Sequence, residues 1–248
     1  GGTIKLDGNY PTGTNNVALG NLAFDAVTSG SSNVAIGAAS LSSNTEGGSN
    51  TSVGKSSLSL NTIGSSNTAI GQNSLENNTT ASNNTAVGKS SLALNTTGAQ
   101  NTAVGSLALD ANTTGSNNVA VGQQALGTNT TADDNTAVGK NSLKFNTTGH
   151  SNVAVGALAL DANTTAEENT AVGFGAAGAT TTGSLNTVVG GQALADNTTG
   201  ASNVAIGREA LHANTTASSN TAVGKHALRA NTTAADNTAM GANALALN

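Results

Sequence analysis

The amino-acid sequence predicts an all-β protein, a parallel β-solenoid (β-roll) of fourteen 17-residue coils. The phrase Asn-(Thr/Val)-Ala-(Val/Ile)-Gly, with minor variants, recurs from Asn16 to Gly241, and its glycine returns every 17 residues in 14 copies without an insertion or deletion. The 248 residues include 31 Gly, and only 2% are aromatic, so a conventional core of bulky side chains is excluded. Such a fixed register is what stacked coils require, because each coil must pack on the one before it.

The repeat divides the chain into a non-repeat N-terminal segment, residues 1–15, and a rod of repeats, residues 16–248. We number the positions of a coil from its glycine, which is position 0. Asn stands at −4 in every copy, an aliphatic residue or Met at −1, Ala or Ser at +3, and Thr at +8 in every complete copy. Leu at +4 and Asn at +7 each have two exceptions, and +10 is Gly or Ala. The residues expected to form the structural ladder in the middle of the rod are Asn101, Asn118, Asn135, Asn112, Leu109, Leu126, Val104, Val121, Gly105 and Gly122.

Each coil is expected to contain two short strands, the Thr-Ala-Val and Ala-Leu stretches, joined by two tight corners. Helical repeats fit poorly, because they need about 33 residues or more and because Asn, Thr, Val and Gly are poor helix formers. The glycine at 0 and the Gly or Ala at +10 would supply the two corners. Leu at +4 and the aliphatic residue at −1 are expected to form the dry interior.

The two Asn columns are predicted to stack as ladders in which amides bond from coil to coil. Glycan attachment is the alternative, because Asn78 begins an Asn-Thr-Thr sequon. The same column keeps its Asn where the sequon is absent, as at Asn44 and Asn61. The architectural interpretation therefore explains the column better.

The Asn-Thr-Ala-Val strand is apolar on both faces, because Val121 points to one side and Ala120 to the other. A strand that is buried on both sides of a thin coil implies a neighbouring chain. The sequence therefore predicts a homo-oligomer about the rod axis, with three chains intertwined or packed together as the most economical closure.

Nothing in the sequence indicates site chemistry. The net charge of −5 and the scattered Lys and Arg argue against a nucleic-acid-binding surface. No apolar run approaches the roughly 20 residues of a membrane span. His150, His212 and His226 occupy different columns and are expected to be surface residues. No nucleophile, base and orienting group recur as a set, so we expect no catalytic, cofactor-binding or metal-binding residues and no enzyme activity.

The phrase Asn-Val-Ala-Ile-Gly at residues 33–37 and 203–207 resembles the strand signature of trimeric autotransporter adhesin heads, which are left-handed parallel β-rolls. The full unit, Asn-Thr-Ala-Val-Gly-x-x-Ala-Leu-x-x-Asn-Thr-Thr-Gly, is similar to repeats of bacterial and phage tail-fibre-like proteins. The adhesin repeat is usually shorter, and the usual tail-fibre aromatics are replaced here by residues such as Lys140 and Asp110. The resemblance implies a homotrimeric shaft or head of an extracellular fibre, on a bacterial surface or a virion, whose partners are its own copies and a cell-surface receptor or glycan.

Two alternatives remain beside the fibre. The chain could be a filament subunit that polymerises end to end, or an ice-binding β-solenoid that presents ranks of Thr. Thr113 and Thr114 are consecutive, so alternation sends them to opposite faces, whereas ice-binding solenoids generally carry Thr-x-Thr on one face. The sequence therefore favours the structural or adhesive fibre.

Overall fold

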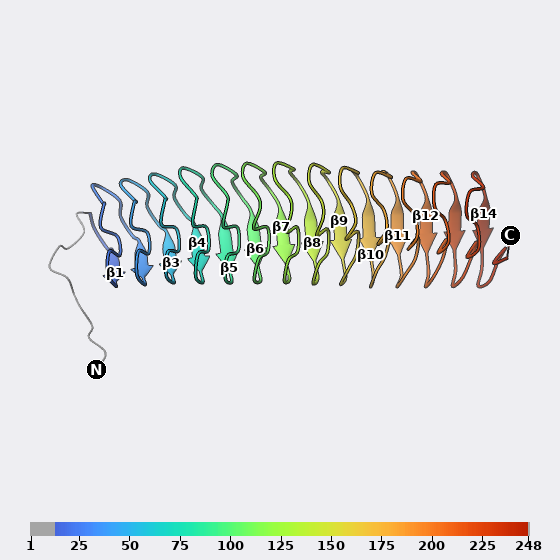
Figure 1. The fold of residues 1–248 in the computed structure, drawn as a ribbon, viewed down its shortest axis with the longest axis horizontal. Coiled ribbons are helices and arrows are strands. Elements are labelled where there is room, and N and C mark those ends of the chain that lie inside the picture. Colours follow the sequence, from blue (N-terminus) through green and yellow to red (C-terminus); the bar gives the residue numbers. More distant parts are fainter. Residues whose placement is uncertain (1–12, 248) are drawn as a thin grey trace, which may run out of the picture. The chain divides into compact units, whose positions relative to one another are not determined.

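The computed structural model describes residues 13–247. The chain divides into two compact units, Gly1–Asn118 and Val119–Asn248, and each is a stack of short parallel strands linked by turns (Figure 1). Residues 1–12, which make up most of the predicted N-terminal segment, and Asn248 lie outside the described residues.

The strands are three residues long and occur once per coil. The first unit contains β1 (Val17–Leu19), β2 (Val34–Ile36), β3 (Thr51–Val53), β4 (Thr68–Ile70), β5 (Thr85–Val87) and β6 (Thr102–Val104). The second unit contains β7 (Val119–Val121), β8 (Thr136–Val138), β9 (Val153–Val155), β10 (Thr170–Val172), β11 (Thr187–Val189), β12 (Val204–Ile206), β13 (Thr221–Val223) and β14 (Thr238–Met240).

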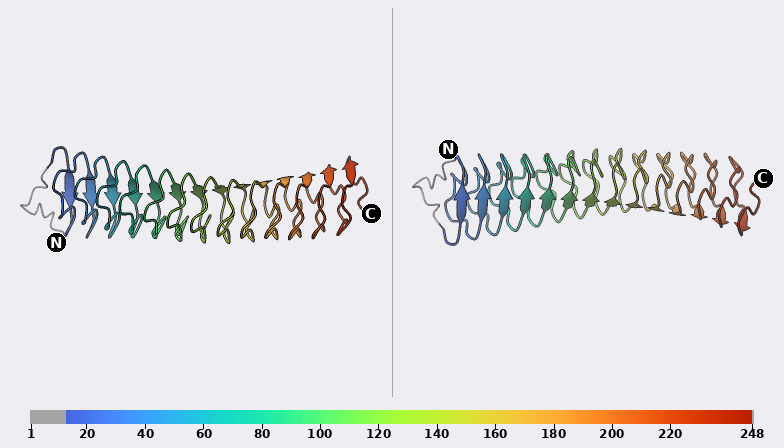
Figure 2. Two further views of the ribbon diagram at one scale, coloured as in Figure 1. Left: turned by 90° about the horizontal axis from the view of Figure 1, so that it is seen from above. Right: turned by 90° about the horizontal axis from the view of Figure 1, so that it is seen from below.

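Within each unit, every strand pairs in parallel with the next strand along the chain, and the paired residues are 17 apart (Figure 2). Thr85 pairs with Thr102 in the first unit, for example, and Thr136 pairs with Val153 in the second. Each unit is therefore a parallel β-solenoid, and the predicted fold class is confirmed.

The expectation of two strands per coil is wrong. The Ala-Leu stretch is a turn, because its backbone enters the left-handed region: φ is 57° at Leu107 and 52° at Leu109. Positions −5, +2 and +4 adopt positive φ throughout the described coils, and none of the three contains Val, Ile or Thr in any copy. Branching at Cβ is what this conformation tolerates least. The backbone thus explains why the largest interior column is Leu and never Ile.

The interior is filled by Leu at +4 and by the central Ala of each strand. Leu109, Leu126, Ala103 and Ala120 are all fully buried. The expectation that the aliphatic residue at −1 belongs to the dry interior is wrong. Val104 and Val121 are partly exposed, because alternation along the strand turns −3 and −1 outward when −2 points inward.

The first Asn column joins successive coils through the backbone. Asn101 donates its N–H to Asn84 Oδ1 at 2.9 Å, and Asn101 Oδ1 accepts the N–H of Asn118 at 2.9 Å. Asn135 and Asn152 repeat this bond at 3.0 Å in the second unit. All of these asparagines are buried, so each amide satisfies a backbone group that has no access to water.

The second Asn column joins side chain to side chain. Asn112 Nδ2 donates to Asn95 Oδ1 at 2.9 Å and to the Gly115 carbonyl at 2.9 Å, and that carbonyl also accepts Asn101 Nδ2 at 2.8 Å. The two columns therefore meet at the carbonyl of position +10. Asn78, which begins one of the Asn-Thr-Thr sequons of this column, is fully buried in the network, so architecture accounts for the column.

The two expected corner positions differ physically. Gly122 has φ of +139°, and a Cβ there would lie 2.5 Å from the Gly139 carbonyl oxygen, so the glycine at 0 is required twice over. The Gly or Ala at +10 needs no unusual φ. A Cβ at Gly47 would collide with the Gly64 carbonyl oxygen and with Asn44 Oδ1, yet Ala81 and Ala132 occupy the same column. Close packing against the amide ladder, rather than a permissive backbone, keeps this column small.

We predict that Leu109→Ile destabilises the first unit far more than its change in shape would suggest. At φ of 52° a β-branched side chain is strained, which costs about 1–3 kcal/mol. Leu109→Met is the matched control, because it conserves volume without branching at Cβ. Denaturant unfolding of both variants checks the prediction, and equal losses for Ile and Met would contradict it.

One break in the second Asn column can be repaired. Thr180 replaces the usual Asn, and Asn163 Oδ1, one coil earlier, is buried without a hydrogen-bond partner. On the other side, Asn197 Nδ2 reaches Thr180 Oγ1 only at 3.3 Å. We predict that Thr180→Asn raises the unfolding free energy by about 1–2 kcal/mol by completing the ladder. Thr180→Val, which keeps the shape and removes the hydroxyl, should lower it; a Thr180→Asn variant that is no more stable than the parent would refute the ladder account.

Candidate functional site

The outer surface of the coils carries the features available for recognition. The first is the strand face, which we define as the outward side chains at −3 and −1 of every strand. It contains only Thr, Val, Ile, Leu and Met, without one charged residue in the fourteen described strands. Ile36, Val155 and Ile206 are 37–38% exposed. Within each unit the strand face is thus an uncharged, mostly apolar strip, partly open to solvent, that repeats with the coil.

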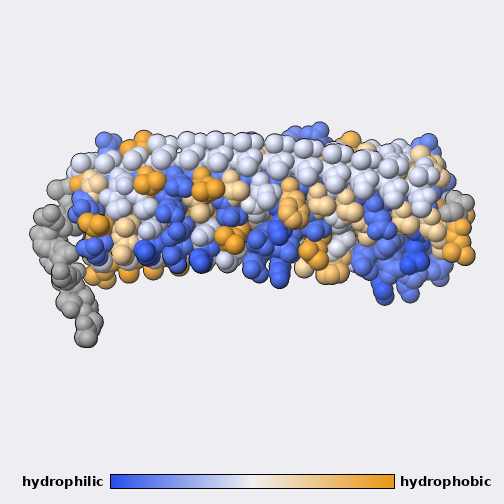
Figure 3. All heavy atoms as spheres, in the orientation of Figure 1, coloured by the Kyte–Doolittle hydropathy of each residue, from blue (hydrophilic) through white to orange (hydrophobic). Residues whose placement is uncertain are grey.

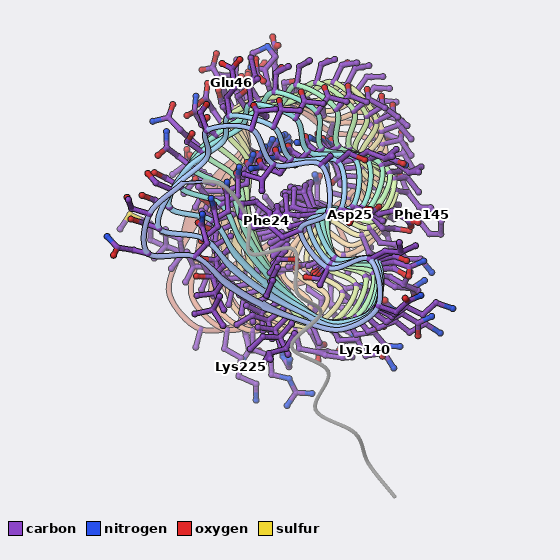
Figure 4. All side chains as sticks on the ribbon, turned by 90° about the vertical axis from the view of Figure 1, so that its left-hand side faces the viewer. Phe24, Asp25, Glu46, Lys140, Phe145 and Lys225 are labelled. Carbon is purple, nitrogen blue, oxygen red and sulfur yellow. The ribbon has the colours of Figure 1, made fainter. Side chains whose placement is uncertain are left out.

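The threonine corner lies at +8 and +9. The hydroxyl at +8 is used internally: Thr96 Oγ1 donates to the Thr113 carbonyl at 3.0 Å, and Thr147 Oγ1 donates to the Thr164 carbonyl at 2.9 Å. The residue at +9, such as Thr97, is exposed. Figure 4 labels Glu46, which holds the +9 position in an early coil, at the upper edge of the coil. Consecutive threonines at this corner therefore do not form two coplanar ranks.

The remaining exposed positions are variable, and the charges lie there. In Figure 4, Lys140, Lys225 and Phe145 project outward from the coil, whereas Phe24, which replaces Leu at +4, points into the interior. Phe24 is 2% exposed and Phe145 is 48% exposed. Figure 3 shows hydrophilic and hydrophobic residues interspersed on one side of the coils, so no single chemistry dominates this surface.

One charged cluster is built more tightly than the others. The carboxylate of Glu209 is almost fully buried, and it contacts Arg229 Nε at 2.9 Å, Arg208 Nη2 at 2.9 Å and His226 Nε2 at 3.4 Å. The hydrogen bond from Arg229 lowers the pKa of Glu209 below its ordinary value, and Arg208 and His226 act in the same direction against the opposing effect of burial. Arg208 and Arg229 therefore balance the charge of this largely buried carboxylate.

All three histidines pair with a carboxylate on an adjacent coil. His150 Nε2 lies 2.6 Å from Glu167 Oε2, His212 Nδ1 lies 3.4 Å from Asp196 Oδ2, and His226 contacts Glu209. The sequence predicts a surface position for each histidine but does not predict these partners. The signal was available, because residues 150 and 167, like 209 and 226, differ by one 17-residue repeat.

Within residues 13–247 no group of three or more His, Asp or Glu side chains could hold a metal ion. In the same described range, no helix is long and apolar enough to cross a membrane. No protein-family model matches the chain, and neither a curated protein nor a solved structure matches it significantly. The expected ladder residues Asn101, Asn112, Asn118, Leu109 and Gly105 all serve the architecture, and Val104 and Val121 belong to the strand face.

We predict that Glu209→Gln destabilises the second unit at neutral pH. A carboxyl whose folded pKa is lowered contributes stability above its unfolded pKa, and this contribution is lost as the pH falls through the lower folded value. The difference in melting temperature between variant and parent should therefore shrink below about pH 4.

Glu168→Gln is the control, because Glu168 is exposed and forms no ion pair in the described residues. It should leave the melting temperature nearly unchanged at both pH values. If Glu209→Gln behaved like this control at pH 7, the cluster would have no stabilising role.

Proposed function

We propose that the chain is a shaft or head segment of an extracellular homotrimeric fibre, with a structural or adhesive role and no catalytic one. The strand face is the observation that carries the proposal. It presents uncharged β-branched and aliphatic side chains on every coil, and contiguous exposed apolar surface of this kind marks an interaction site.

The strand face suits another copy of the same chain. It carries no charge that a partner would have to neutralise, and its repeat matches the repeat of an identical chain. A three-residue strand is about 10 Å long and strands lie about 4.8 Å apart, so the face covers roughly 290 Å² in the six-stranded first unit and roughly 380 Å² in the eight-stranded second unit. Each is a substantial part of the roughly 800 Å² that each partner buries in a stable interface. Closed rotational symmetry is the usual outcome for identical subunits, and the resemblance to trimeric adhesin heads favours three.

Burial of the strand face in a trimer would leave on the outside those variable positions that do not border it. A receptor or a cell-surface glycan would meet those positions, which differ from coil to coil. Their diversity supports an adhesive role on a bacterial surface or a virion, and the uniformity of the buried columns supports a structural one.

We predict that light scattering gives about three times the 23.8 kDa chain mass.

Val138→Lys combined with Val155→Lys should produce a folded monomer, because both side chains point outward on the strand face and their charges would be buried only in the assembly. The control is Ala162→Lys combined with Ala195→Lys, at the variable positions +6 and +5, which do not border the strand face; Lys144 and Arg229 occur naturally at +5. This pair should remain trimeric. A native chain that is monomeric at every concentration tested would sink the proposal.

A further inference from the structure

One coil of the second unit departs from the others. Between Gly173 and Val189, Phe174 follows the glycine and is 58% exposed, and Leu185 stands at −5 and is 55% exposed. In the rest of that unit the +1 position holds Gln123, Lys140, Ala157, Gly191, Arg208, Lys225 and Ala242. The −5 position there holds Asp134, Ser151, Glu168, Ser202, Ser219 and Asp236. Large apolar residues thus occupy both positions in this coil alone.

These two positions border the strand face. Phe174 is separated from the end of β10 by Gly173 only, and Leu185 is separated from the start of β11 by Asn186 only. Thr187 and Val189, the outward residues of β11, are both exposed, and Val189 is 39% exposed. Phe174 therefore widens the apolar strip on one side at the level of β10, and Leu185 widens it on the other side at the level of β11. Elsewhere in the unit these border positions are polar, charged or small.

We infer that Phe174 and Leu185 set the axial register in which copies of this chain assemble. The inference rests on the proposed assembly through the strand face. It goes beyond that proposal because it states which coil of one chain lies beside which coil of its neighbour. Copies related by rotation about a common axis bring identical coils to the same level. Only that register places both widened levels, β10 with Phe174 and β11 with Leu185, beside the same levels of the neighbouring chains.

A uniform strand face cannot specify register by itself. If one chain shifts by one coil along its neighbour, every strand still lies beside a chemically near-identical strand. Only the contacts of the last coil are lost. Interfaces with so little variation are prone to slippage, and proteins suppress it with a residue that fits in one register only. In a chain shifted by one coil, Phe174 would lie at the level of Ala157 or Gly191, and Leu185 at the level of Glu168 or Ser202.

Disulfide cross-linking tests the inference directly, because the native chain contains no cysteine. Val138→Cys and Val155→Cys chains are mixed, assembled and oxidised, and peptide mass spectrometry counts cross-links between like and unlike positions. In the native background like positions should dominate. With Phe174→Ser and Leu185→Ser added to both chains, cross-links between residues 138 and 155 should rise roughly tenfold relative to like pairs, which corresponds to about 1.4 kcal/mol of lost discrimination.

Phe145→Ser is the matched control, because Phe145 is an exposed aromatic residue of the same unit at the variable position +6. It should leave the cross-link pattern unchanged. A trimeric Phe174→Ser/Leu185→Ser chain with the native pattern would overturn the register role. A folded but monomeric one would overturn it too, since the pair would then be the main source of affinity. Absence of assembly in the native background would instead refute the proposed function.

Discussion

Each buried asparagine amide finds its partner one coil away, and the rest of the structure depends on that repeat. Asn101 and Asn118 are bonded because they are 17 residues apart, and one inserted residue would move an amide away from every group it satisfies. The Leu and Ala interior is thin, so unpaired amides inside it would be costly. The absence of insertions across fourteen copies follows from this requirement.

The sequence predicts the period, the parallel stacking and the asparagine ladders, because each leaves a column of identical residues. It does not predict the path of the chain between Gly105 and Asn112, where a second strand was expected. The only sign of a turn with positive φ in the sequence is that three columns, −5, +2 and +4, lack β-branched residues. A missing residue type is harder to notice than a repeated one. The ion pairs of Glu209 were missed for a different reason, since they depend on how long side chains reach between coils.

The division between inside and outside was predicted correctly for Leu109 and wrongly for Val104. Hydrophobicity alone ranks Val above Ala as an interior residue. Here the coil is so narrow that its centre admits only Ala from the strand, and the larger Val and Thr are displaced to the outer side. A typical strand therefore places its small Ala inside the coil and its larger Val or Thr on the strand face.

The asparagine ladder also has a direction. Wherever two asparagines of the second column are bonded, the Nδ2 of one coil donates to the Oδ1 of the preceding coil, as Asn78 does to Asn61 and Asn214 does to Asn197. The amide dipoles within a unit consequently all point the same way. The two faces at which such a column terminates are then chemically unlike, one rich in acceptors and the other in donors. Any further coil that extends the column must orient its amide in the same direction. The asparagine column can therefore be extended only by coils of the same donor-to-acceptor polarity.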